Sequence, residues 1–91
     1  MAKLSKKEIQ QILKDLKDWQ VKRNAIVKTF TLPPVKEAIA FVTKVADLAE
    51  VANRHLDILI QYNKVTLTLS TGTEGGVTGH DINLATQIEK A

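Results

Sequence analysis

Side chains of three different chemistries gather between residues 50 and 57. Glu50 supplies a carboxylate, Asn53 an amide and His55 an imidazole, a group that titrates near neutral pH. Such groups can transfer protons or hold a small polar ligand. We therefore predict a pocket for a small polar ligand here. The alternatives are an ion pair between Glu50 and Arg54 at helical spacing and an ordinary surface histidine.

A helix is predicted before this stretch and a strand after it. Apolar residues recur at helical spacing from Val35 to Ala52 in two adjacent rows, an arc wider than one sheet face requires. A chain of 91 residues has few layers with which to cover such a helix, so we expect a subunit interface there in preference to complete burial. Residues 55–61 alternate between apolar and polar, which predicts a strand whose polar face carries His55 and Asp57.

The remaining segments predict two more helices and three more strands. Capping boxes at Ser5–Glu8 and Thr78–Asp81 open a helix at each end of the chain. Alternating or β-rich segments flank two turns, at residues 23–24 and 62–64. The order helix, two strands, helix, two strands, helix predicts one α+β domain over residues 1–91. Its antiparallel four-stranded sheet should carry helices packed on one face.

A glycine-rich loop is predicted between the last strand and the last helix. The run from Gly72 to Gly76 lacks the lysine followed by serine or threonine that a phosphate-binding P-loop needs. A loop that closes onto a capped helix is favoured over an anion site. The neighbouring Ser70 and Thr71 show no sequence sign of activation as nucleophiles.

Composition excludes several classes of function. The chain has no cysteine and two histidines, so we expect no metal site and no thiol redox chemistry. Its net charge of +3 comes from interspersed charges, and its four aromatic residues form no base-stacking pattern, which argues against nucleic-acid binding. No apolar run approaches the ~20 residues of a membrane span, and no secretory signal opens the chain. We expect a cytoplasmic protein that binds no membrane.

Three stretches of the second half carry a resemblance to a known family. They are 50–57 (Glu-Val-Ala-Asn-Arg-His-Leu-Asp), 62–71 (Tyr-Asn-Lys-Val-Thr-Leu-Thr-Leu-Ser-Thr), and the Gly-Gly-Val-Thr of 75–78 with the Asp-Ile-Asn-Leu-Ala that follows at 81–85. Together they resemble pterin-4a-carbinolamine dehydratase. The first third of the chain matches only as a pattern of helix, tryptophan and hairpin.

The resemblance implies an activity and a set of site residues. Members of this family dehydrate 4a-hydroxytetrahydrobiopterin to the quinonoid dihydropterin without a metal or a cofactor. On this basis we predict catalytic roles for His55 and Glu50. The predicted substrate-binding residues are Asn53, His55, Asp57, Ser70 and Thr71.

The sequence departs from the family motif at two of its three histidines. The motif is a glutamate, three residues, then His-His-Pro-Glu/Asp, with a third histidine after the last strand. Here Arg54 replaces the first histidine of the motif, Leu56 replaces the proline, and Gly72 replaces the third histidine. Arginine stays protonated and glycine has no side chain, so neither can cycle a proton. Because each lost acid or base group costs ~10²–10⁴ in rate, we predict weak or absent dehydration.

Two functions from different classes follow. The first is a binding or assembly module on the dehydratase fold, and the family offers two precedents: a dimerisation cofactor of a homeodomain transcription factor and RuBisCO assembly factors of α-carboxysomes. The alternative is a genuine 4a-hydroxytetrahydrobiopterin dehydratase in tetrahydrobiopterin recycling. The predicted partners are a second copy in a homodimer or homotetramer, and either RuBisCO as a protein client or a pterin as a ligand. In the family, sheets join edge to edge in dimers and helices pack dimers into tetramers.

Overall fold

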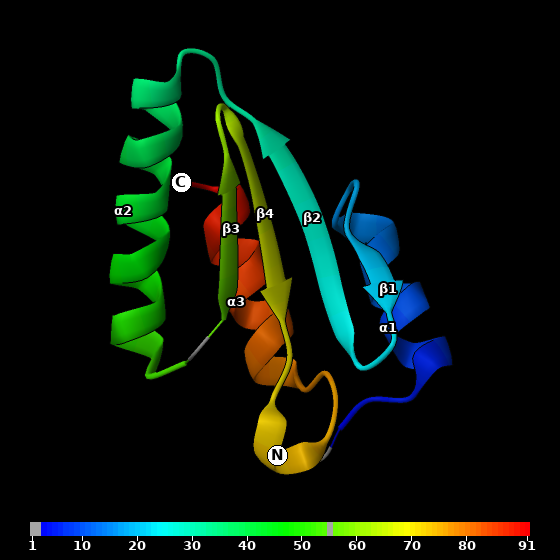
Figure 1. The fold of residues 1–91 in the computed structure, drawn as a ribbon. Helices are drawn as coiled ribbons and strands as arrows, with labels where there is room; N and C mark the ends of the chain where they lie inside the picture. The colour runs from blue at the N-terminus through cyan, green and yellow to red at the C-terminus, as the bar shows by residue number, and fades with distance from the viewer. Residues whose placement is uncertain (1–2, 55) are drawn as a thin grey trace.

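The computed structural model describes residues 3–54 and 56–91, which form helices on one side of a sheet (Figure 1). The elements in chain order are α1 (Lys6–Ile12), the 3-10 turn η1 (Leu13–Asp15), β1 (Gln20–Lys22), β2 (Ala25–Thr31), α2 (Val35–Ala52), β3 (Asp57–Gln61), β4 (Lys64–Leu69), the 3-10 turn η2 (Gly72–Glu74) and α3 (Gly79–Glu89). The predicted order and the predicted α+β class are confirmed.

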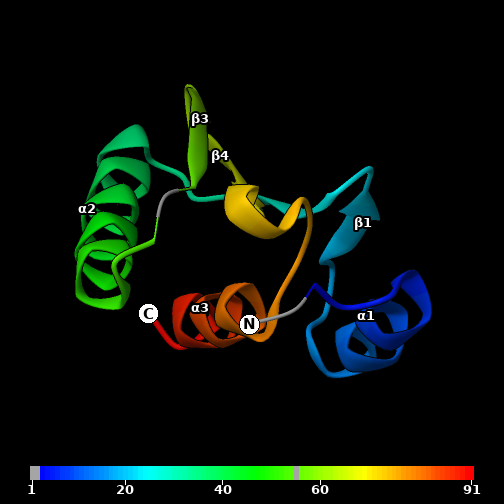
Figure 2. The same cartoon turned by 90° about the horizontal axis from the view of Figure 1, so that it is seen from below.

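The four strands form one antiparallel sheet in the order β1-β2-β4-β3. Strand β4 lies in the centre, with Leu67 opposite both Lys28 of β2 and Ile58 of β3. Figure 2 shows α1, α2 and α3 side by side on the same face of the sheet. Strand β3 is therefore an edge strand, and it lies beside α2, the helix that precedes it in the chain.

The core lies between the inner face of the sheet and the three helices. Its fully buried side chains come from both layers, because apolar residues alternate on the strands and recur at helical spacing on α2 and α3. They include Ile26, Val45, Val65, Leu67, Leu69, Leu84 and Ile88. An aromatic row joins the layers at one end. The Phe30 ring centroid lies 6.2 Å from that of Trp19 and 4.8 Å from that of Phe41.

Both predicted capping boxes are present. Ser5 and Glu8 exchange hydrogen bonds at the start of α1, and the Ser5 backbone N–H bonded to Glu8 lowers the pKa of that exposed carboxylate. Thr78 and Asp81 form the second box at the start of α3. The two helices therefore begin at the residues that the sequence indicated.

Helix α2 buries one face only. Ala38, Phe41, Val45 and Ala49 face the core, whereas Ile39 is 49% exposed. Complete burial of this helix is thus excluded in the isolated chain. The wide apolar arc leaves a strip of apolar side chains uncovered.

Two connections are well defined by the backbone. Pro34 is the N-cap residue of α2, where its backbone is extended. The loop after β4 contains η2, and Thr71 forms an isolated β-bridge with Gly76. Among the described residues, no helix is both long and apolar enough to cross a membrane.

Candidate functional site

The junction between α2 and β3 is built by a left-handed asparagine. Asn53 ends α2 with φ 54° and ψ 47°, a conformation that asparagine adopts more readily than most residues. The Asn53 N–H donates to the carbonyl of Glu50, and the Arg54 N–H donates to that of Ala49 at 2.9 Å. These two bonds make a Schellman motif, which turns the chain sharply out of the helix. The direction in which Arg54 leaves α2 is therefore determined locally.

The side chain of Arg54 reaches across to the segment that follows β4. Its Nη2 donates a hydrogen bond to the Oγ1 of Thr71 at 3.1 Å. The same Thr71 hydroxyl donates to the Oδ2 of Asp81 at 2.7 Å. The site thus joins three elements that are distant in sequence: the end of α2, the end of β4 and the start of α3.

A buried hydroxyl pair determines how the protons of this network are arranged. The Oγ1 atoms of Thr71 and Thr78 lie 2.9 Å apart, and both residues are buried. A hydroxyl has one proton, and that of Thr71 goes to Asp81, so Thr78 must donate to Thr71. Asp81, only 2% exposed, also accepts the backbone N–H of Thr78 at 2.9 Å. Each buried oxygen in the network is therefore partnered.

A cavity opens beside this network. It has a volume of about 300 Å³ and is lined by Asn53, Arg54, Ser70, Thr71, Gly72 and Thr73. This volume lies at the lower end of the range for small-molecule sites. Three predicted substrate-binding residues (Asn53, Ser70 and Thr71) line it, together with the two residues at the family's histidine positions.

The other predicted site residues are placed differently. Glu50 is exposed on the last turn of α2, and Asp57 is exposed on β3, and neither lines this cavity. The predicted catalytic and substrate-binding residue His55 lies outside the described residues. Among the described lining residues, Arg54 alone is ionisable.

The ion pair between Glu50 and Arg54, one of the alternative interpretations, is not formed. The sequence spacing favoured it, but the Schellman turn carries Arg54 off the helix axis and its guanidinium binds Thr71. The ion pair found among residues 3–54 and 56–91 joins Lys28 to Glu89. Arg54 is thus a half-buried cation, and no carboxylate of the described residues pairs with it.

Gly72 offers room at the family's third histidine position. Its φ lies outside the left-handed region, and a Cβ built on it would meet no heavy atom within 4 Å. The left-handed residue of this loop is Gly75, with φ 70°. A side chain at position 72 is therefore compatible with the backbone.

Sequence reasoning missed part of the site. Thr73 lines the cavity, and Thr78 and Asp81 hold Thr71, although the last two were assigned only to a helix cap. The sequence showed both Thr71, which follows a predicted strand, and a capping box seven to ten residues later. Nothing in their spacing showed that the three side chains meet.

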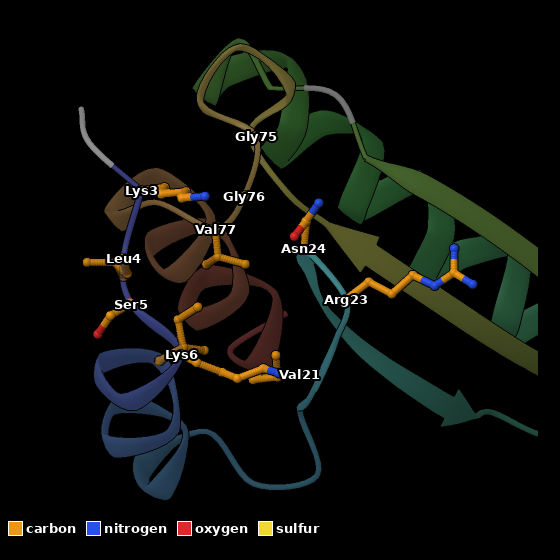
Figure 3. A pocket seen from close by; sticks show the side chains of 11 residues that line it. Lys3, Leu4, Ser5, Lys6, Val21, Arg23, Asn24, Gly75, Gly76 and Val77 are labelled. Carbon is orange, nitrogen blue, oxygen red and sulfur yellow. The ribbon is translucent and has the colours of Figure 1, made fainter.

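A second cavity is lined by the N-terminal segment together with Gly75, Gly76 and Val77, which lie in the loop between Thr71 and Thr78. Its volume is about 340 Å³, and Figure 3 shows Lys3 beside Gly76 and Lys6 reaching toward Val21, while the Arg23 side chain points away. The Lys3 side chain packs so closely that a Cβ at Gly76 would lie 3.2 Å from its Cδ. This cavity shares no residue with the predicted site.

Residues 3–54 and 56–91 contain no group of three or more histidine, aspartate or glutamate side chains that could hold a metal ion. The chemistry of the described cavity is that of hydroxyls, an amide and one guanidinium.

Comparison with known proteins identifies the family. The sequence model described as "Pterin 4 alpha carbinolamine dehydratase" matches residues 2–91. The chain belongs to the pterin-4a-carbinolamine dehydratase family. Within this family, it is 52% identical over 89 residues to a "putative pterin-4-alpha-carbinolamine dehydratase" of Roseiflexus castenholzii, covering 98% of this chain and 96% of the relative. A protein of the same name from Sulfurisphaera tokodaii is 43% identical over 90 residues, covering 99% and 97%.

Solved structures agree with this assignment. A transcriptional coactivator/pterin dehydratase from Brucella melitensis superposes with a TM-score of 0.92 at 32% identity, covering 97% of this chain and 96% of that one. A pterin dehydratase-like RuBisCO assembly factor of the α-carboxysome superposes with a TM-score of 0.66 at 22% identity, covering 79% and 83%. The second likeness shows the dehydratase fold alone.

Proposed function

We propose that this dehydratase-family chain binds a pterin in the cavity beside Arg54 and dehydrates a 4a-hydroxytetrahydropterin slowly. The observation that carries the proposal is the cavity itself, which forms where the family motif predicts a ligand. The full-length relatives at 43–52% identity are named for this activity, which supports the enzymatic class.

The slow dehydration rate follows from the residues that replace the family's first and third histidines. Arg54 keeps its proton at physiological pH, and its Nη2 is engaged with Thr71. Gly72 contributes no group at all. Of the motif's acid and base residues, Glu50 and His55 remain, and Glu50 lies outside the cavity lining. His55 is therefore the proposed proton-transfer residue.

The test is the dehydration of freshly generated 4a-hydroxytetrahydropterin at neutral pH, with the uncatalysed rate subtracted. We expect kcat/KM at least about 10²-fold below that of a family member with all three histidines, because a lost acid or base group typically costs that much. Replacing His55 by glutamine should remove the remaining rate. A parent rate within about tenfold of the three-histidine enzyme would contradict the proposal.

A second candidate function, an assembly module, is favoured by exposed apolar residues beside the sheet edge. Ile39 on α2 is 49% exposed, and on the edge strand β3 Leu59 is 53% and Ile60 is 40% exposed. Exposed apolar residues beside an unpaired strand edge are typical of surfaces that bind another chain. RuBisCO remains the predicted client, and co-migration of the two purified proteins in gel filtration would test it.

The same surface predicts a homodimer or homotetramer. Light scattering at about 10 µM should give a mass of two or four chains. Ile39→Asp should lower that mass while circular dichroism stays unchanged, because its side chain already faces solvent in the single chain. Phe41→Asp would be a poor probe. Its ring is 9% exposed and packs on Phe30, so that change would unfold the core. A monomeric parent would contradict the prediction.

A further inference from the structure

We infer that Arg54 makes this cavity selective for ligands that carry an anionic group, a carboxylate above all. The inference rests on the proposed function, because it names the kind of pterin that the proposed site prefers. Three features of Arg54 support it: a charge that no carboxylate of the described residues pairs with, a fixed position, and the cavities that it lines.

The charge of Arg54 is not neutralised by the described residues. The guanidinium is partly buried, and its Nε is covered from solvent without a hydrogen-bond acceptor among residues 3–54 and 56–91. The nearest carboxylate in the network belongs to Asp81, and it is reached only through the Thr71 hydroxyl. A partly desolvated cation of this kind gains more from a ligand anion than an exposed, hydrated one does.

The position of Arg54 is determined at both ends of the residue. Its backbone is held by the Schellman bond from its N–H to the carbonyl of Ala49. Its Nη2 is held by Thr71, which is itself held by Thr78 and Asp81. A ligand anion therefore meets a guanidinium that loses little conformational freedom on binding.

Arg54 lines two cavities. The first has a volume of about 300 Å³ and is also lined by the hydroxyl residues Ser70 and Thr73 and by Gly72, at which a Cβ would meet no heavy atom within 4 Å. The second has a volume of about 290 Å³ and is also lined by His80 and Asn83 of α3. Arg54 is the residue that the two linings share. An anionic substituent can therefore contact the cation while the rest of the ligand occupies the first cavity.

The test compares two pterins that differ at one substituent. Pterin-6-carboxylate and 6-hydroxymethylpterin are titrated into the protein, and quenching of pterin fluorescence gives each Kd. We expect the carboxylate to bind about tenfold more tightly at low salt, a ratio typical of one charge-assisted hydrogen bond. The ratio should shrink as salt is raised.

Matched variants assign the selectivity to Arg54. Arg54→Gln should bring the two Kd values within about twofold, because it removes the charge and keeps an amide. Lys36→Gln removes one positive charge at the far end of α2, about 25 Å along the helix, and should leave the ratio unchanged. Equal Kd values in the parent, or a ratio that survives Arg54→Gln, would overturn the inference and leave the pterin site standing.

A third probe covers the case in which neither pterin binds. That result would refute pterin binding. Benzoate, a carboxylate without a pterin ring, would then test whether Arg54 binds an anion. The Arg54 Nε–H is shielded from water, so its NMR signal should be protected from exchange and should shift saturably with benzoate. A signal that does not respond would overturn the anion site as well.

Discussion

Arg54→His combined with Gly72→His is expected to raise dehydratase kcat/KM at least about tenfold over the parent chain. The double change places an imidazole at both family histidine positions, and imidazole is the side chain that transfers protons most effectively near neutral pH. Gly72 has no left-handed φ and no heavy atom near its Cβ position, so the backbone accepts a side chain there.

The cost of losing Arg54 is set by its bond to Thr71. That hydroxyl still donates to Asp81 and accepts from Thr78, so it stays partnered, and the cost should be about 1 kcal/mol. The two single variants are the controls. We expect each of them to raise kcat/KM by less than the double variant does. A well-folded double variant with the parent's rate would show that the pocket differs from that of active members in more than its acid and base groups.

Asp81→Ala is expected to lower the free energy of unfolding by about 3 kcal/mol. The change removes the acceptor for two buried donors, the Thr71 hydroxyl and the Thr78 N–H, and also removes half of the capping box of α3. In a chain of this length, such a loss lowers Tm by roughly 12–24 °C. Thermal unfolding followed by circular dichroism measures it.

Two further variants distinguish the effect of losing the buried hydrogen bonds on stability from the effect of losing a carboxylate charge. Asp81→Asn keeps an amide oxygen that can accept both bonds, so it should cost about 1 kcal/mol. Asp47→Ala removes a carboxylate from an exposed position on α2 and should change stability by less than about 0.5 kcal/mol. A loss for Asp81→Ala no larger than that for Asp47→Ala would show that the network does not stabilise the fold.

Local patterns in the sequence determined the elements and their order. The alternation of Val65, Leu67 and Leu69 with polar residues requires a strand with one buried face, because successive side chains point to opposite sides. The boxes at Ser5–Glu8 and Thr78–Asp81 mark helix starts, because each satisfies backbone donors within one turn. All of these signals act over a few residues, and that is why they can be read without coordinates.

Part of the lining of the proposed cavity was also predicted from the sequence. Asn53, Ser70 and Thr71 were predicted from family motifs, and they line one cavity. The motif could not decide which predicted residues share that cavity. Glu50 and Asp57 lie close to Arg54 in sequence, yet one is exposed on the helix and the other on the strand.

Only the tertiary structure decided the partner of Arg54. Sequence spacing favoured Glu50, four residues away, whereas the guanidinium binds Thr71, seventeen residues away. Helical spacing predicts a contact only while the chain remains helical, and Asn53 ends the helix before Arg54. The bond to Thr71 and its link to Asp81 arise because the ends of α2 and β4 meet the start of α3. That meeting depends on how the helices pack on the sheet, which no local pattern encodes.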